Sequence, residues 1–133
     1  MIAANAYTQY RKAQVETADQ RQVILMLYDG ALRFLGSGMG ALRQGDLQAA
    51  HKNLLRVQDI VCELMASLDL EAGEVAVSLY RLYEYSYHLL LQANIKKDIE
   101  PLYQVEKMLL ELREAWQRSQ LCLLYTSPSP RDS

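Results

Sequence analysis

Few residues of this chain could take part in catalysis or bind a metal ion, and their spacing favours neither role. The two histidines, His51 and His88, are far apart in the sequence. Glu84 and His88 are one helical turn apart and could touch, but a solvated pair is the simpler interpretation. A di-iron helical bundle would need repeated Glu-x-x-His motifs, which the sequence lacks. We therefore predict neither a metal site nor a cofactor.

Nucleophilic and phosphate-binding chemistry is equally unsupported. The two cysteines, Cys62 and Cys122, lack the spacing of a zinc site or a redox pair, and Cys62 is best interpreted as a small apolar residue on a helix. No glycine-rich phosphate loop follows a strand, and no serine elbow is present. The sequence therefore predicts a protein that is not an enzyme.

Composition indicates a single domain without a charged partner surface. The chain has 133 residues, of which 50% are hydrophobic and 23% charged, and its formal net charge is -2. Such a balance favours neither nucleic acid nor an anionic membrane as partner. No segment approaches the roughly 18 apolar residues of a membrane span, and no signal-peptide pattern opens the chain. We expect a soluble, cytoplasmic protein that is not inserted in a membrane.

The elements that must carry any function are helices, because apolar residues recur at intervals of three and four through most of the chain. The first helix is expected over about 19–42, with Asp19 as its N-cap. Gly36, Gly38 and Gly40 predict fraying or close packing near its end. Its inner positions are Ile24, Leu27, Ala31, Phe34 with Leu35, and Leu42.

Three further helices follow, joined by short links. Gly45 and Asp46 predict a helix end and a new N-cap, residues 70–73 break the second helix, residues 94–97 form the next turn, and Asp98 caps the fourth helix. The inner positions of the second are Leu47, Ala50, Leu54, Val57, Val61, Leu64 and Leu68, those of the third are Val75, Leu79, Leu82, Ser86, Leu89 and Ala93, and those of the fourth are Leu102, Val105, Leu109, Leu112 and Trp116. Short links force antiparallel neighbours, so we predict an all-α, up-down-up-down four-helix bundle.

The two ends of the chain lie outside this pattern. Residues 1–16 are expected to form an N-terminal arm, and the bundle is expected over 17–120. Residues 121–133 contain Pro128 and Pro130 and resemble a translated sequencing adapter, so we expect a non-native tail and exclude it from the functional interpretation.

Two helices carry more apolar surface than a bundle needs. On the second helix Leu55, Cys62 and Met65 form a partial second stripe, and on the third Tyr80, Tyr83 and Tyr87 do the same. They could complete a wide core or line a groove for an amphipathic partner helix. Tyrosine favours the groove, because it combines broad apolar area with a polar tip.

Two further features complete the candidate site. Tyr7 and Tyr10 on the arm could cover such a groove while it is empty. Tyr28, Asp29 and Gly30 stand in a row on the first helix, where Gly30 indicates close approach of a neighbouring backbone.

Several of these segments, in this order and spacing, resemble the FliS family of flagellar secretion chaperones. They are Ala6-Tyr7-x-x-Tyr10, Val15-x-Thr17-Ala18, Met26-Leu-Tyr-Asp-Gly-Ala31, Leu68-Asp-x-x-x-Gly73, Leu79-Tyr80-x-Leu82-Tyr83, Ala93-Asn94 with Asp98, and Leu112-Arg-x-x-Trp116. The resemblance extends from residue 1 to about 120. Family members commonly have Ser-Pro where this chain has Asp19-Gln20.

The resemblance implies a cytoplasmic export chaperone. It would bind the disordered C-terminal segment of flagellin, prevent premature polymerisation, and assist delivery to the gate of the flagellar type III export apparatus. Tyr7 and Tyr10 fall on the arm that caps part of the client surface in the family. Tyr28 and Asp29 fall on its signature helix, where folding and binding roles both stay open. A co-chaperone or an anti-sigma factor is a further possible partner.

An alternative is a helical scaffold that forms homodimers or binds a regulator. A stoichiometric flagellin partner would favour the chaperone, and self-association alone would favour the scaffold.

Overall fold

The described part of the chain, residues 20–118 of a computed structural model, consists of four α-helices and one short 3-10 turn. The elements are α2 (Gln20–Gln44), α3 (Leu47–Ser67), η1 (Leu70–Ala72), α4 (Glu74–Lys96) and α5 (Glu100–Arg118). The prediction of an all-α protein with four helices is confirmed. The arm with Tyr7 and Tyr10, the Asp19 cap and the C-terminal tail lie outside the described residues.

The links between helices have the predicted chemistry. Gly45 takes a positive φ of 77°, and the Asp46 carboxylate accepts a hydrogen bond from the Ala49 amide at 3.1 Å. Asp98 likewise accepts from the Glu100 amide at 3.0 Å, with Pro101 in the first turn of α5. These contacts satisfy amides that have no partner within the helix, so α3 and α5 each have a defined start.

One link differs from its prediction. Residues 94–97 are not a turn, because α4 continues through Asn94 to Lys96 and ends at Lys97, which has a φ of 54°. The Lys97 amide donates to the Ala93 carbonyl, and its ammonium donates to the Asn94 carbonyl at 2.6 Å. The left-handed ending is therefore held without a glycine.

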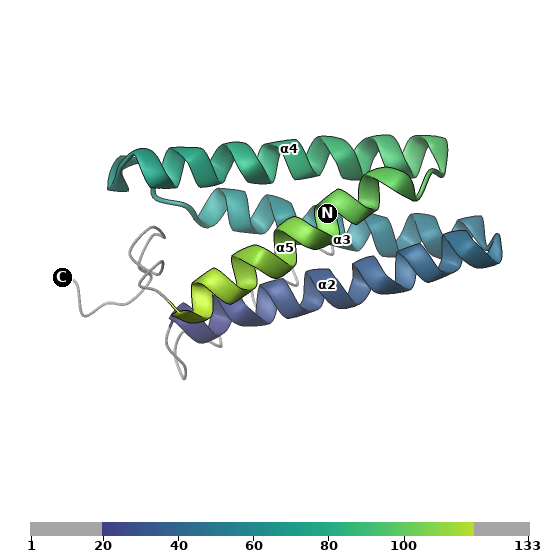
Figure 1. Cartoon of the computed structure of the whole chain (residues 1–133), viewed down its shortest axis with the longest axis horizontal. Coiled ribbons are helices and arrows are strands. Elements are labelled where there is room, and N and C mark those ends of the chain that lie inside the picture. The colour runs from purple at the N-terminus through teal and green to yellow at the C-terminus, as the bar shows by residue number, and fades with distance from the viewer. Residues whose placement is uncertain (1–19, 119–133) are drawn as a thin grey trace.

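The four helices form an antiparallel bundle in which each packs against its chain neighbour and α5 also packs against α2. Figure 1 shows α3 and α4 side by side, while α5 runs back obliquely so that its end lies beside the start of α2. There the Trp116 indole donates to the Arg21 carbonyl at 2.9 Å. The predicted up-down-up-down topology is confirmed.

Most predicted inner positions are buried, but two of the six predicted for α4 are wrong. Val75 and Leu82 are 61% and 43% exposed, whereas Tyr83 is fully buried. The buried positions of α4 are Ala76, Leu79, Tyr83, Ser86, Leu89, Leu90, Ala93 and Asn94. Leu79, Ser86, Leu89 and Ala93 were predicted correctly, whereas spacing alone could not choose between Leu82 and Tyr83. At four other predicted inner positions, Leu47 is half exposed, and Phe34, Leu42 and Leu112 are partly buried.

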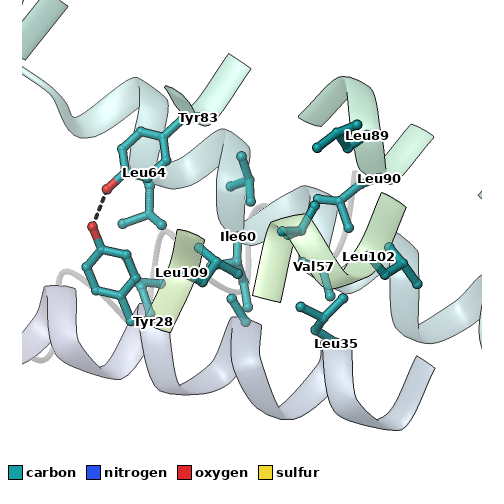
Figure 2. Packing of buried hydrophobic residues seen from close by; sticks show 14 of the residues in the cluster. Tyr28, Leu35, Val57, Ile60, Leu64, Tyr83, Leu89, Leu90, Leu102 and Leu109 are labelled. Carbon is teal, nitrogen blue, oxygen red and sulfur yellow. Dashed lines mark hydrogen bonds between the residues drawn. The ribbon is translucent and has the colours of Figure 1, made fainter. Parts of the chain in front are cut away.

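The buried tyrosine of α4 meets a second one from α2. Tyr28 and Tyr83 are both fully buried and their hydroxyls are hydrogen bonded to each other. Figure 2 shows the two rings pointing toward one another within the cluster around Leu64 and Leu109. Each aromatic body fills the core while the paired hydroxyls satisfy one another, as burial of a polar group requires.

The glycines of α2 do not interrupt it, so the predicted fraying is not observed. A Cβ at Gly38 would meet the Leu54 side chain at 3.0 Å, which explains this glycine by close packing. At Gly30 the neighbour is the Ile60 side chain at 3.4 Å, rather than the backbone that was predicted. Gly36 and Gly40 have nothing within 4 Å of such an atom.

Candidate functional site

A hydrogen bond between His51 and Asn94 fixes how α3 and α4 lie against each other. The imidazole Nδ1 is 3.2 Å from the Asn94 side-chain oxygen, and the Lys97 ammonium reaches the same oxygen at 2.6 Å. His51 is in the second turn of α3 and Asn94 is in the last turn of α4. The contact therefore marks one end of the seam between two antiparallel helices.

From this contact, one row of side chains on each helix follows the seam. The α3 row is His51, Leu55, Gln58, Cys62 and Met65, and the α4 row is Asn94, Leu91, Tyr87, Glu84 and Tyr80. Both rows alternate spacings of three and four residues, which keeps each on one side of its helix. Because both helices rise equally per residue, the rows run side by side. We call these ten residues the α3–α4 strip.

The strip offers apolar surface that the core does not consume. Leu55 and Leu91 are 42% and 36% exposed, and Cys62 is also exposed. Met65, Tyr80 and Tyr87 are partly buried and pack against the core with their inner sides. Apart from its polar His51 end, Gln58 and the exposed carboxylate of Glu84, the strip is therefore apolar.

The structure brings five of the predicted site residues together on this strip: Leu55, Cys62, Met65, Tyr80 and Tyr87. Their assignment to client binding stays a prediction. The other five members of the strip, among them Leu91 and Gln58, were not predicted as site residues. Leu91 extends the tyrosine row by four residues, and Gln58 was passed over because it is polar.

Two predicted site residues belong to the interior instead. Placing Tyr83 on an outer face is wrong, because Tyr83 is an inner position of α4 with no exposed surface. Tyr28 is equally buried and is hydrogen bonded to Tyr83. Both rings therefore pack in the core, and their assignment to client binding stays a prediction.

Asp29, beside Tyr28, points outward and joins α2 to α5. Its carboxylate accepts from the Arg113 guanidinium at 2.5 Å. This hydrogen bond and the charge of Asp29 raise the pKa of Arg113 above its usual range. Half of the Asp29 side-chain surface remains exposed. The structure thus gives Asp29 a contact within the bundle.

The titratable groups near the strip are shifted mainly by burial. Partial burial raises the pKa of the Cys62 thiol above 9.0, and the carboxylates of Asp59 and Glu63 add to this effect. Burial also raises the pKa of Asp59 above 3.8, although the nearby Arg56 opposes the shift. A thiol with a raised pKa is a poor nucleophile at neutral pH.

Within residues 20–118, the structure contains no group of three or more His, Cys, Asp or Glu side chains that could hold a metal ion. No helix of the described segment is both long and apolar enough to cross a membrane.

Comparison with known proteins identifies the family. The family described as "Flagellar protein FliS" matches residues 3–120. The flagellar secretion chaperone FliS of Bacillus subtilis is 35% identical over 119 residues, covering 90% of this chain and 89% of the relative. The corresponding protein of Salmonella typhimurium is 36% identical over 124 residues, covering 89% and 92%. The chain belongs to the FliS family.

A third FliS relative, the flagellar secretion chaperone FliSB of Pseudomonas aeruginosa, is 33% identical and is covered over 96% of its length. The FliS family consists of flagellar secretion chaperones and not of enzymes, so the predicted family and class of function are confirmed. The residues that contact a client are a separate question, for which the α3–α4 strip is the candidate.

Proposed function

We propose that this FliS-family protein binds the disordered C-terminal segment of flagellin in the cytosol. Binding would prevent premature polymerisation and assist delivery to the flagellar type III export apparatus. Membership of a family of flagellar secretion chaperones supports the function, and the exposed apolar part of the α3–α4 strip supports the site.

The dimensions of the strip suit a helical client. From His51 to Met65 the α3 row extends over 14 residues, or about 21 Å at 1.5 Å per residue. An amphipathic client helix of about four turns could lie along it. Each apolar side chain that it buries would contribute about 1.5 to 3 kcal/mol before the cost of ordering the client is subtracted. Micromolar affinity is therefore within reach without ATP or a cofactor.

The experiment is calorimetric titration of the full chain with the C-terminal segment of the flagellin encoded by the same genome. Leu55→Glu and Leu91→Glu should each weaken binding about tenfold or more, because each replaces exposed apolar surface on the strip with a charge. The matched control is Leu110→Glu, since Leu110 is 52% exposed on α5, which contributes no residue to the strip. Equal losses for all three variants would refute the strip as the binding site. No binding by the unmodified chain would refute the function.

Self-association is the alternative use of the same surface. A bundle that buries the strip against a second copy would elute as a dimer. Leu55→Glu and Leu91→Glu would each convert this dimer to a monomer, and the flagellin segment would not change the oligomeric state. A flagellin segment that instead dissociates such a dimer would support the chaperone. Contacts with the export gate, a co-chaperone or an anti-sigma factor are further predictions that pull-down experiments can address.

A further inference from the structure

The strip contains a buried polar atom that has no partner. Gln58 is only 5% exposed, and its side-chain oxygen Oε1 makes no hydrogen bond. Such an atom is destabilising, because it has left water without gaining a replacement hydrogen bond. An unsatisfied acceptor at a contact surface indicates a ligand that supplies the donor.

The position of Gln58 is as informative as its burial. It is the middle residue of the α3 row, seven residues from His51 and seven from Met65. The same count along α4 leads from Asn94 to Tyr87, so Gln58 lies level with Tyr87. Its neighbours in the row, Leu55 and Cys62, are both exposed. The unpartnered oxygen therefore lies directly beneath the apolar surface proposed to bind the client.

A second unpartnered atom provides a contrast. The Ser67 hydroxyl is also buried and makes no hydrogen bond. Ser67 is two residues after Met65, which turns it to the other side of α3. Only one of these two atoms, Gln58 Oε1, lies on the strip.

We propose that Gln58 accepts a hydrogen bond from a free backbone N–H of the bound client segment. This inference rests on the proposed function. Within a continuous client helix the backbone N–H groups are already bonded, except in the first turn. The donor is therefore at a point where the client helix begins or is interrupted, level with Gln58. Apolar client side chains would flank that point and contact Leu55 on one side and Cys62 on the other.

The free protein does not hinder this contact. Because Oε1 has no hydrogen bond to lose, the flexible carboxamide can turn outward between Leu55 and Cys62 when a donor arrives. Gln58 should therefore destabilise the free protein and strengthen client binding, a combination that is not expected of a residue with a packing role only. Removing its polarity should raise stability and weaken binding at the same time.

The test is Gln58→Met, which keeps the length of the side chain and removes its polar atoms. The melting temperature of the free protein should rise by about 4 °C, and the dissociation constant for the flagellin segment should increase about fivefold. Ser67→Ala is the matched control: it should not lower the melting temperature, and it should leave affinity unchanged. Gln58→Leu should shift both quantities in the same directions as Gln58→Met.

Three results would overturn the inference. A lower melting temperature or a loss of helicity in Gln58→Met would show that Gln58 has partners in the free protein. Unchanged or tighter binding would show that the client does not use the oxygen. Equal weakening by Ser67→Ala would assign the effect to α3 as a whole. The two binding results require that the unmodified chain binds the segment. If the unmodified chain does not bind it, the proposed function itself is refuted.

Discussion

The outer edges of two helix pairs, α2 with α5 and α3 with α4, differ in what their side chains contact. Three hydrogen-bonded pairs connect α2 to α5: Asp29 with Arg113, Arg43 with Tyr103, and the Arg21 carbonyl with Trp116. Between α3 and α4, His51 and Asn94 are paired at one end, and the side chains beyond them are mostly apolar and partly exposed. The first edge is occupied by contacts within the bundle, and the second has surface left for a partner.

This contrast explains how a chaperone of one domain can be stable and still keep an apolar surface for binding a client. Hydrogen bonds between α2 and α5 can hold those helices without a wide apolar edge. The apolar surface on α3 and α4 can then be kept for a client, because the inner rows of both helices already supply the core. Apolar residues are also exposed elsewhere, among them Val75, Leu82 and Tyr85 on α4 and Tyr103 and Leu110 on α5.

The largest expected effect separates the inner row of α4 from its outer surface. Tyr83→Glu should lower the free energy of unfolding by about 4 kcal/mol or more, because it places a charge in the core and removes the hydroxyl pair with Tyr28. Tyr85→Glu is the control on the same helix, since Tyr85 is 52% exposed and donates only to Gln104. Urea unfolding followed by circular dichroism measures both. A stably folded Tyr83→Glu protein would place this tyrosine outside the core.

The sequence predicted the helices well, because their caps and their spacing agree. Asp46 and Asp98 cap the helices that they were expected to cap, and the seven-residue pattern of α3 holds from Ala50 onward. The inner positions of α4 were obtained only in part in this way. Leu82 and Tyr83 both fit a spacing of three and four, but Tyr83 is the buried one, and its hydroxyl is paired with that of Tyr28 on α2, a contact 55 residues away.

The candidate site was predictable in part for a related reason. Apolar spacing found Leu55, Cys62 and Met65 because residues on one side of a helix share that side whatever they pack against. Pairing the row with its counterpart on α4 required the contact between His51 and Asn94, which has no local signal in the sequence. The importance of Gln58 depends on an absent partner, which only a structure can show.

Gly36→Ala tests whether a change on α2 can alter stability without altering client binding. A Cβ at Gly36 would meet nothing within 4 Å, so alanine should stabilise the helix by about 0.5 to 1 kcal/mol. Because Gly36 is on α2, affinity for the flagellin segment should not change. Gly38→Ala, whose Cβ would meet Leu54 at 3.0 Å, should gain less in the same unfolding measurement. Weaker client binding by Gly36→Ala would extend the binding surface to α2.

A smaller effect is expected for the ion pair between α2 and α5. Asp29→Ala should lower the free energy of unfolding by about 0.2 to 1 kcal/mol, because the pair is largely exposed to solvent. The loss should shrink at high salt, and Asp29→Ala should bind the segment normally. Arg113→Ala should have a similar effect on stability, and the double variant should lose less than the sum of the two. Weaker binding without a change in stability would give Asp29 a role in client recognition.

The mildest test leaves the strip almost intact and uses Cys62 as a reporter. Its raised pKa means that less thiolate is present at pH 8 than in an unfolded chain, so alkylation by iodoacetamide should be slower than for a free thiol. The rate should rise as the pH passes 9 and the thiolate fraction increases. The flagellin segment should slow the reaction further by covering the strip.

Cys122→Ser makes Cys62 the only thiol, and adding Cys62→Ala and Leu110→Cys moves that thiol to α5. Protection confined to Cys62 would place the client on the α3–α4 side, whereas equal protection at both positions would mean that the client covers both edges and that the contrast between them does not govern binding.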